Sequence, residues 1–298
     1  MKIIYASLLI PILCLLCAKQ IFAQSNPTDK VDKTDKTDKD DKAGSFKFGI
    51  NYLSNNVIMG RADTIKTPML IPDIKYTFSN GIYFSGSVTY IPNRITGKLD
   101  EGNLTGGYDF DITDNLSAET SFSKLFYNKN STQIGSSINS TINASLDYDI
   151  SGIVTPTIGA DYNFVSKGFK NDVFVNAGLS HDFITTGIIN DDDFLVISPL
   201  AEVNGGTQNF YDAYLTQKKY KLAANTSKAL AKQKARLSKF NLLDYEFSVP
   251  MAYKVGVLIL HTTPSYAISQ NKLPANITGS MINKPGIFYF DIGATIKL

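Results

Sequence analysis

Apolar and polar residues alternate along most of this chain, and the final stretch, residues 286–298, shows the pattern most clearly. Because successive side chains of a strand point to opposite faces, the alternation predicts a strand with one apolar and one polar face. Its length suits a tilted strand that crosses a bilayer, which takes about 9–11 residues. The apolar face would carry Phe288, Phe290, Ile292, Ala294, Ile296 and Leu298, and the polar face Tyr289, Asp291, Gly293, Thr295 and Lys297.

The same alternation recurs upstream, and we expect about twelve strands. A count of ten or fourteen is also compatible with the pattern, because Phe174, Leu200 and Val257 blur the alternation in three places. The expected strands cover residues 46–52, 74–78, 82–90, 104–112, 116–122, 142–150, 154–164, 173–184, 194–204, 245–253, 258–268 and 286–298.

Short turns alternate with longer loops between these strands. Turn residues lie near Asn80, Asp114 and Gly152, where Gly, Asn and Asp tolerate a hairpin backbone. This rhythm is typical of bacterial outer-membrane barrels, with short periplasmic turns and longer external loops. An even strand count places both chain ends in the periplasm, and closure follows because lipid cannot satisfy an open sheet edge. We therefore predict an all-β fold, an antiparallel up-and-down transmembrane β-barrel over residues 45–298.

The N-terminal residues have the pattern of a secretory signal peptide. Lys2 precedes an almost entirely apolar run, as in the positive and hydrophobic regions of such signals. We expect residues 1–23 to be removed by cleavage after Ala23, which leaves Gln24 as the new start.

Both cysteines, Cys14 and Cys17, lie in this leader. A lipoprotein reading would make one of them the lipidated residue, but a leucine precedes each of them where a small residue is expected. The mature chain would then hold no disulfide and no thiolate site. Histidine is limited to His181 and His261, which leaves little for metal binding or for histidine-based catalysis.

A low-complexity segment, residues 24–44, separates the signal from the barrel. It contains three Thr-Asp-Lys units and cannot bury apolar surface. We expect a solvated periplasmic tether. A cation-binding repeat is disfavoured, because the aspartates lack the glycine and final glutamate of a calcium loop.

The signal, the hairpin rhythm and the terminal strand together resemble outer-membrane β-barrels, closest to the uncharacterised porin-like barrels of Gram-negative bacteria of the Bacteroidetes type. The segment 51–57 with Gly60, Arg61 and Pro68, and the segment 245–250, look like matching parts of such proteins. The resemblance implies an outer-membrane location and a C-terminal strand read by the barrel-assembly machinery. It implies no substrate. Leu298 stands where this class commonly ends in an aromatic residue.

If the apolar face meets lipid, the other face lines the lumen, and acids outnumber bases there. Rings of acidic side chains favour cations in a pore. The alternative is that these carboxylates are hydrated or hydrogen-bonded and only make the wall polar. The basic residues would be Lys47, Lys75 and Lys297, and the acidic ones Asp73, Asp109, Asp111, Glu119, Asp147, Asp149, Asp161, Asp182, Glu202, Glu246 and Asp291.

An insertion at residues 205–241 is strongly basic and, by strand parity, external. Alanine and leucine are frequent in residues 222–237, which predicts a helix of about four turns there. Three roles stay open: a solvated loop, a plug drawn into the acidic lumen, or a contact with lipopolysaccharide. The basic residues are Lys218, Lys219, Lys221, Lys228, Lys232, Lys234, Arg236 and Lys239.

The leading functional hypothesis is a passive, non-enzymatic outer-membrane channel for small solutes that prefers cations. A closed structural or surface-interaction barrel is the alternative. A membrane-embedded lipid hydrolase is the weakest of the three hypotheses, because neither histidine lies in a recognisable catalytic motif. We expect no cofactor, no metal and, with a net charge of only +2, no nucleic-acid partner.

Overall fold

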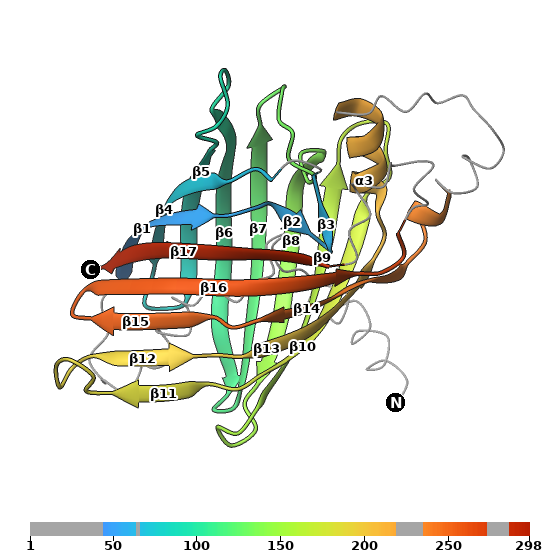
Figure 1. Ribbon diagram of the computed structural model, residues 1–298. Coiled ribbons are helices and arrows are strands. Elements are labelled where there is room, and N and C mark those ends of the chain that lie inside the picture. The colour runs from blue at the N-terminus through green and yellow to red at the C-terminus, as the bar shows by residue number, and fades with distance from the viewer. Residues whose placement is uncertain (1–43, 64–65, 219–234, 273–285) are drawn as a thin grey trace, which may run out of the picture.

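The computed structural model describes residues 44–63, 66–218, 235–272 and 286–298, and these form a closed antiparallel β-barrel (Figure 1). The barrel closes because β17 pairs with both β1 and β16. Nine of the twelve barrel strands are single elements: β1 (Ser45–Leu53), β4 (Met69–Thr77), β5 (Ile82–Tyr90), β6 (Leu99–Thr113), β7 (Leu116–Tyr127), β8 (Ile138–Tyr148), β9 (Thr155–Val165), β16 (Leu258–Ser269) and β17 (Ile287–Lys297).

The other three barrel strands are each broken into two elements. They are β10 (Asp172–Ser180) with β11 (Phe183–Thr186), β12 (Phe194–Ile197) with β13 (Leu200–Gly206), and β14 (Asn241–Ser248) with β15 (Met251–Val255). Pro199 and Pro250 lie in two of the breaks, where a missing N–H cannot extend the ladder. The expectation of twelve antiparallel strands in a barrel is confirmed.

The two ends of the barrel differ. At the short-turn end, tight connections join the strands; at the long-loop end lie the longer connections, including the hairpin β2 (Val57–Ile58) and β3 (Arg61–Ala62). The predicted turns are present. At one of them Gly81 has a φ of 86°, which glycine adopts without strain, and its N–H bonds to the carbonyl oxygen of Phe78 at 3.0 Å.

The outside of the barrel is apolar and the inside polar. Phe84 and Leu104 are each 60% exposed, whereas Thr105 and Ser123 on the opposite face are each 4% exposed. Water-soluble monomers rarely expose a continuous apolar surface, whereas an apolar outer band is what a membrane barrel presents to lipid. The predicted assignment of the two faces therefore matches the direction in which the side chains point.

In the described ranges, helix lies in α3 (Asn209–Ala213), in the π-helical turn η1 (Tyr214–Lys218) and at residues 235–237. The last three residues of the helix predicted at 222–237 are therefore helical, and the rest of that prediction falls outside the described residues. No helix in the described ranges is long and apolar enough to cross a membrane.

Asp193 organises the connection between β11 and β12 at the short-turn end. Its carboxylate accepts hydrogen bonds from the backbone N–H groups of Ile188, Ile189 and Asn190 and from the Tyr253 hydroxyl, at 2.6–2.9 Å. Burial by itself would raise the pKa of the Asp193 carboxyl, but the hydrogen bonds, led by the one from Tyr253, lower it to about 2.

Replacing Asp193 with asparagine should lower the stability of the barrel in a pH-dependent way. A depressed folded-state pKa gives stability that is present above the unfolded value of 3.8 and is lost as the pH falls through about 2. Urea unfolding midpoints should therefore differ between wild type and Asp193→Asn at pH 7 and converge near pH 2. A constant difference across this range would contradict the assignment. Asp191→Asn, an exposed acid of the same loop, is the control.

Candidate functional site: the inner wall and the long-loop mouth

Hydrogen bonds tie inward-facing side chains to neighbouring strands, and several carboxylates take part. The Tyr83 hydroxyl donates to Glu119 at 2.6 Å, and the Tyr289 hydroxyl donates to Glu246 at 2.9 Å. The side-chain amide of Asn176 donates to Glu202 at 2.9 Å. The two tyrosines each reach past one intervening strand. Their side chains therefore extend along the inner wall and do not point straight into the lumen.

Glycines make room for these side chains. A Cβ added at Gly107 would lie 2.5–2.6 Å from atoms of the Tyr83 side chain, so this tyrosine passes directly over the glycine on its way to Glu119. At Gly293, an added Cβ would lie 2.6 Å from His261 Nε2 and 2.7 Å from the Ile50 carbonyl oxygen. Glycine at these positions permits the close approach of side chains to the backbone.

One continuous polar network crosses four strands at Gly293. Asn51 donates to Asp73 at 2.8 Å, its carbonyl oxygen lies 2.6 Å from His261 Nε2, and the same nitrogen lies 3.5 Å from Asp291. His261 is therefore part of the inner wall, held between an amide and a carboxylate.

Gly293→Ala should break this network. The added methyl group has to displace the His261 ring and also meets a backbone carbonyl that cannot rotate away, so we expect a loss of about 1–3 kcal/mol in the free energy of unfolding. Gly102→Ala is the matched control, since a Cβ at Gly102 meets no atom within 4 Å. Urea titration of both variants in lipid vesicles measures the difference, and equal losses would contradict the role given to Gly293.

The remaining predicted acids lie in different surroundings. Asp147 accepts a hydrogen bond from Thr157 at 2.7 Å, and Asp161 is buried on the inner face of β9. Asp109 and Asp111 are exposed near the short-turn end of β6. Two others lie outside the barrel strands: Asp149 caps a turn through the Gly152 N–H at 2.7 Å, and Asp182 lies in the break between β10 and β11.

The three lysines of the inner wall form one row. Lys47 of β1 is directly opposite Lys297 of β17 on one side and Lys75 of β4 on the other. The Lys75 ammonium lies 4.4 Å from the centre of the Tyr83 ring. Three positive charges of the wall therefore lie side by side on adjacent strands, two of which also carry Asp73 and Asp291. Lys254 of β15, opposite the buried Phe194 and Ile259, adds a positive charge elsewhere on the wall.

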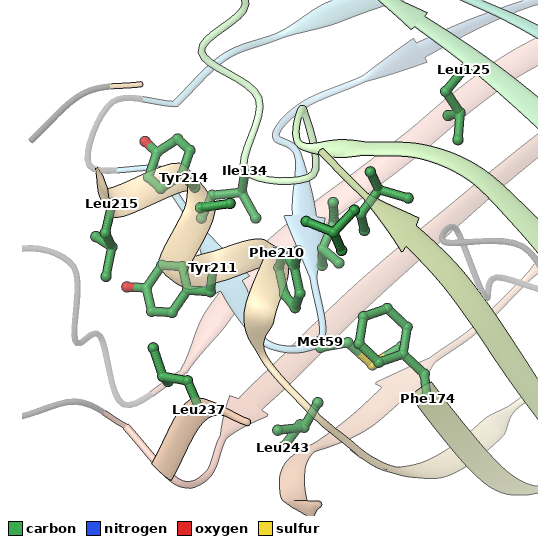
Figure 2. Packing of buried hydrophobic residues seen from close by; sticks show 14 residues of the cluster. Met59, Leu125, Ile134, Phe174, Phe210, Tyr211, Tyr214, Leu215, Leu237 and Leu243 are labelled. Carbon is green, nitrogen blue, oxygen red and sulfur yellow. The ribbon is translucent and has the colours of Figure 1, made fainter. Parts of the chain in front are cut away.

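The long-loop end of the lumen has an apolar inner surface, which the sequence analysis did not anticipate. Inward-facing Leu125, Ile138, Val165 and Phe174 line the ends of β7–β10 and pack with side chains from α3, η1 and the loop at 128–137. The Phe174 and Phe210 rings meet edge to face, with centroids 5.5 Å apart. Figure 2 shows Phe210, Ile134 and Met59 converging with Phe174 in this cluster.

The β2–β3 hairpin connects this cluster to the opposite wall. Ile58 and Met59 belong to the cluster around Phe210, whereas Val57 and Ala62 pack in a second cluster on the ends of β1, β4, β16 and β17. The members of the second cluster are Leu53, Val57, Ala62, Met69, Ile91, Ala267, Ile287 and Tyr289. The hairpin therefore joins the two clusters, and we call the hairpin, α3 and η1, which pack inside the barrel at this end, the plug.

Arg61 holds the plug to the wall. It is 5% exposed, and its guanidinium donates twice to the Gln208 side-chain oxygen, at 2.7 and 3.0 Å. It also donates to the carbonyl oxygens of Met59, Leu243 and Gln270 at 2.7–2.9 Å. These five bonds use all five N–H groups of the guanidinium. One side chain thus joins the hairpin, the start of α3, β14 and the loop after β16.

Asp172 of β10 holds the start of α3. Its carboxylate accepts from the backbone N–H groups of Asn209 and Phe210 at 2.7 and 2.6 Å, and from the Thr207 hydroxyl at 2.6 Å. Gln208 at the N-cap position makes no side-chain capping bond, so a carboxylate from the barrel wall satisfies the first N–H groups of the helix.

The predicted basic residues of the insertion are not part of the plug core as described. Lys219, Lys221, Lys228, Lys232 and Lys234 fall outside the described residues, and so does the side chain of Lys218. Arg236 and Lys239 are exposed. The charge complementarity expected between insertion and lumen therefore stays a prediction, whereas apolar packing and the hydrogen bonds of Arg61 and Asp172 attach the described part of the insertion.

The second histidine, His181, lies in the break between β10 and β11. The His181 ring packs edge to face on Phe183, with centroids 4.3 Å apart. Within the described ranges, no group of three or more His, Cys, Asp or Glu side chains is arranged to hold a metal ion.

Sequence reasoning missed Arg61, Gln208, Asp172 and the aromatic residues of α3. Two signals were available. The loop at 54–68 contains Val57, Ile58 and Met59, which is unusually apolar for a solvated loop. Phe174 and Leu125 interrupt the polar face of their strands, which marks the places where the lumen is not open to water.

Comparisons with known proteins reach solved barrels only at low similarity. No family model and no curated protein sequence matches this chain. A KdgM porin structure has a TM-score of 0.46 at 10% identity, covering 85% of this chain and 98% of that one. A NanC porin structure has a TM-score of 0.45 at 12% identity, covering 86% and 100%. LpxR from Salmonella typhimurium has a TM-score of 0.41 at 10% identity, covering 85% and 99%.

The class of this protein is therefore defined by its own fold: it is a twelve-stranded antiparallel β-barrel with an apolar outside, a polar inside and a plug packed on the inner wall at the long-loop end. At the identities and TM-scores of its structural neighbours, any more particular role has to come from the residues themselves.

Proposed function

We propose that this chain is a bacterial outer-membrane channel for small solutes that favours cations and is restricted at its external end by the plug. The short-turn end then faces the periplasm, and the long-loop end faces outside. The observation that carries the proposal is the inner wall, where carboxylates from most of the strands outnumber the basic side chains, three of which form the lysine row on β1, β4 and β17. Such a wall attracts cations and repels anions.

Conductance in planar bilayers tests the proposal. Purified protein in a potassium chloride gradient should give a reversal potential that reports a higher permeability for potassium than for chloride. The combined variant Glu119→Gln, Asp147→Asn and Asp291→Asn should bring the permeability ratio close to one. Asp191→Asn, which removes a charge outside the lumen, is the control and should leave the ratio unchanged. A ratio that does not respond to the three lumen substitutions contradicts the proposed selectivity.

The packed long-loop end favours a second candidate, a closed barrel with a structural or surface-interaction role. Here the plug is a permanent part of the fold and no solute passes. The two candidates differ in one measurement: a correctly folded barrel that stays electrically silent, even after the plug is loosened, would support the closed barrel.

The proposal includes the partners of the outer membrane. Lipid contacts the exposed aromatic and aliphatic residues of the barrel, and the basic insertion reaches lipopolysaccharide phosphates. The C-terminal strand β17 would present the assembly signal. The pairing of β17 with β1 supports a role for β17 in assembly, because it makes β17 the strand that closes the barrel.

A further inference from the structure

We infer that the inner wall of β13 and β14 forms a binding site for a primary ammonium group of a small organic cation. This inference rests on the proposed function and deepens it by naming a solute class. Four polar side chains define the site: Asn204 faces Asp244 across the two strands, and Glu202 faces Glu246 one step further along. Directly opposed like charges destabilise a strand pair unless something compensates them.

A β-bulge directs the upper half of this site inward. The register between β13 and β14 shifts at Asn204 and Gly205, so Leu243 is the extra residue. As a result Leu243 and Asp244 are both fully buried, although neighbours in a regular strand face opposite sides. The Gly60 backbone covers Asp244, since a Cβ there would lie 2.8 Å from the Asp244 Cβ. The site therefore lies directly beneath the plug.

Three buried acceptor atoms in this site make no hydrogen bond of normal geometry, although the Asn204 side chain lies close enough to interact with the Asp244 carboxylate. They are both carboxylate oxygens of Asp244 and the side-chain oxygen of Asn204, and the two residues are 0% and 3% exposed. Buried acceptors are normally paired, and an unpaired one is destabilising. What the site lacks is a group that brings N–H donors and positive charge together.

Arg61 does not supply this group. Its charge attracts that of Asp244, but its five N–H groups are committed to Gln208 and to three carbonyl oxygens. A primary ammonium group carries three N–H donors and one positive charge, which matches the three unpaired acceptors. Glu202 and Glu246, which are only half-buried, extend the negative surface towards the lumen, so a cation reaches the site from that side.

Calorimetric titration of the detergent-solubilised full chain with putrescine tests the inference. We expect saturable binding, no binding of the neutral analogue 1,4-butanediol, and at least tenfold weaker putrescine binding in Asp244→Asn. Asp191→Asn, which removes an exposed carboxylate outside the lumen, should change the affinity less than twofold. Should Asp244→Asn fail to fold, the double variant Glu202→Gln and Glu246→Gln should weaken binding at least threefold.

Absence of putrescine binding to the wild type, or equal effects of Asp244→Asn and Asp191→Asn, would overturn the inference. The titration needs no ion flow, so its result is independent of conductance. Putrescine binding to a barrel that does not conduct would support the ammonium site and contradict the channel function. Conduction without putrescine binding would support the channel function and contradict the ammonium site.

Discussion

Replacing Arg61 with alanine should raise the single-channel conductance at least twofold. The substitution removes five hydrogen bonds that join the hairpin, α3, β14 and the loop after β16. It also leaves buried acceptors unpaired, which we expect to cost roughly 3–5 kcal/mol of local stability. A plug weakened by that amount should spend part of its time away from the wall, and the open fraction should appear as larger current steps.

The control is Arg236→Ala, which removes an exposed arginine from the same end of the barrel. Its conductance should equal that of the wild type. If Arg61→Ala loosens the plug, as seen by faster hydrogen exchange of residues 209–215, and the conductance stays the same, then the plug does not limit ion flow.

Replacing Phe210 with alanine should loosen the plug through packing alone. Phe210 is 0% exposed and packs edge to face on Phe174. Truncation of a fully buried phenylalanine costs about 3–5 kcal/mol. At 1.4 kcal/mol for each factor of ten, the amides of α3 should exchange between two and nearly four orders of magnitude faster.

Phe240→Ala is the matched control, because Phe240 is 58% exposed. We expect its exchange rates to lie close to those of the wild type. Hydrogen exchange followed by mass spectrometry measures the amide exchange rate of each peptide segment in both variants. Uniform acceleration over the barrel strands as well as α3 would contradict the view that the plug unfolds separately from the wall.

Alternation with a period of two was enough to predict the barrel, its strand number and the direction of each face. Phe84 and Leu104 point outward and Thr105 inward, as the pattern requires. The physical reason is that a strand between lipid and a polar lumen has only one way to orient its side chains. Turn residues such as Gly81 then fix where each hairpin ends.

The plug could not be predicted in the same way. Its contacts join parts of the chain that lie far apart: Arg61 reaches Gln208 and Gln270, which are 147 and 209 positions away. No local period records such a contact. The bulge at Leu243 was equally hidden, because one extra residue in a strand leaves no mark on composition and only a short fault in the alternation.

The acids of the wall were found by alternation, but their separate surroundings were not. Asp149 follows the parity of Asp147 on its strand, and Asp182 follows that of Ser180, yet they lie in a turn and in a strand break. Parity gives the face of a side chain only while the strand continues, and it gives no information about the glycines that let Tyr83 reach Glu119.

The separation of the plug contacts along the chain has a consequence for biogenesis. Loop-closure entropy delays contacts between distant residues, and the second apolar cluster, which receives the β2–β3 hairpin on the ends of β1, β4, β16 and β17, is complete only when β17 joins β1. We therefore expect the plug to dock last, after insertion and closure. Each newly made molecule would then pass through a brief stage as an unobstructed pore. How quickly the loops settle would decide how much a cell leaks while it makes this protein.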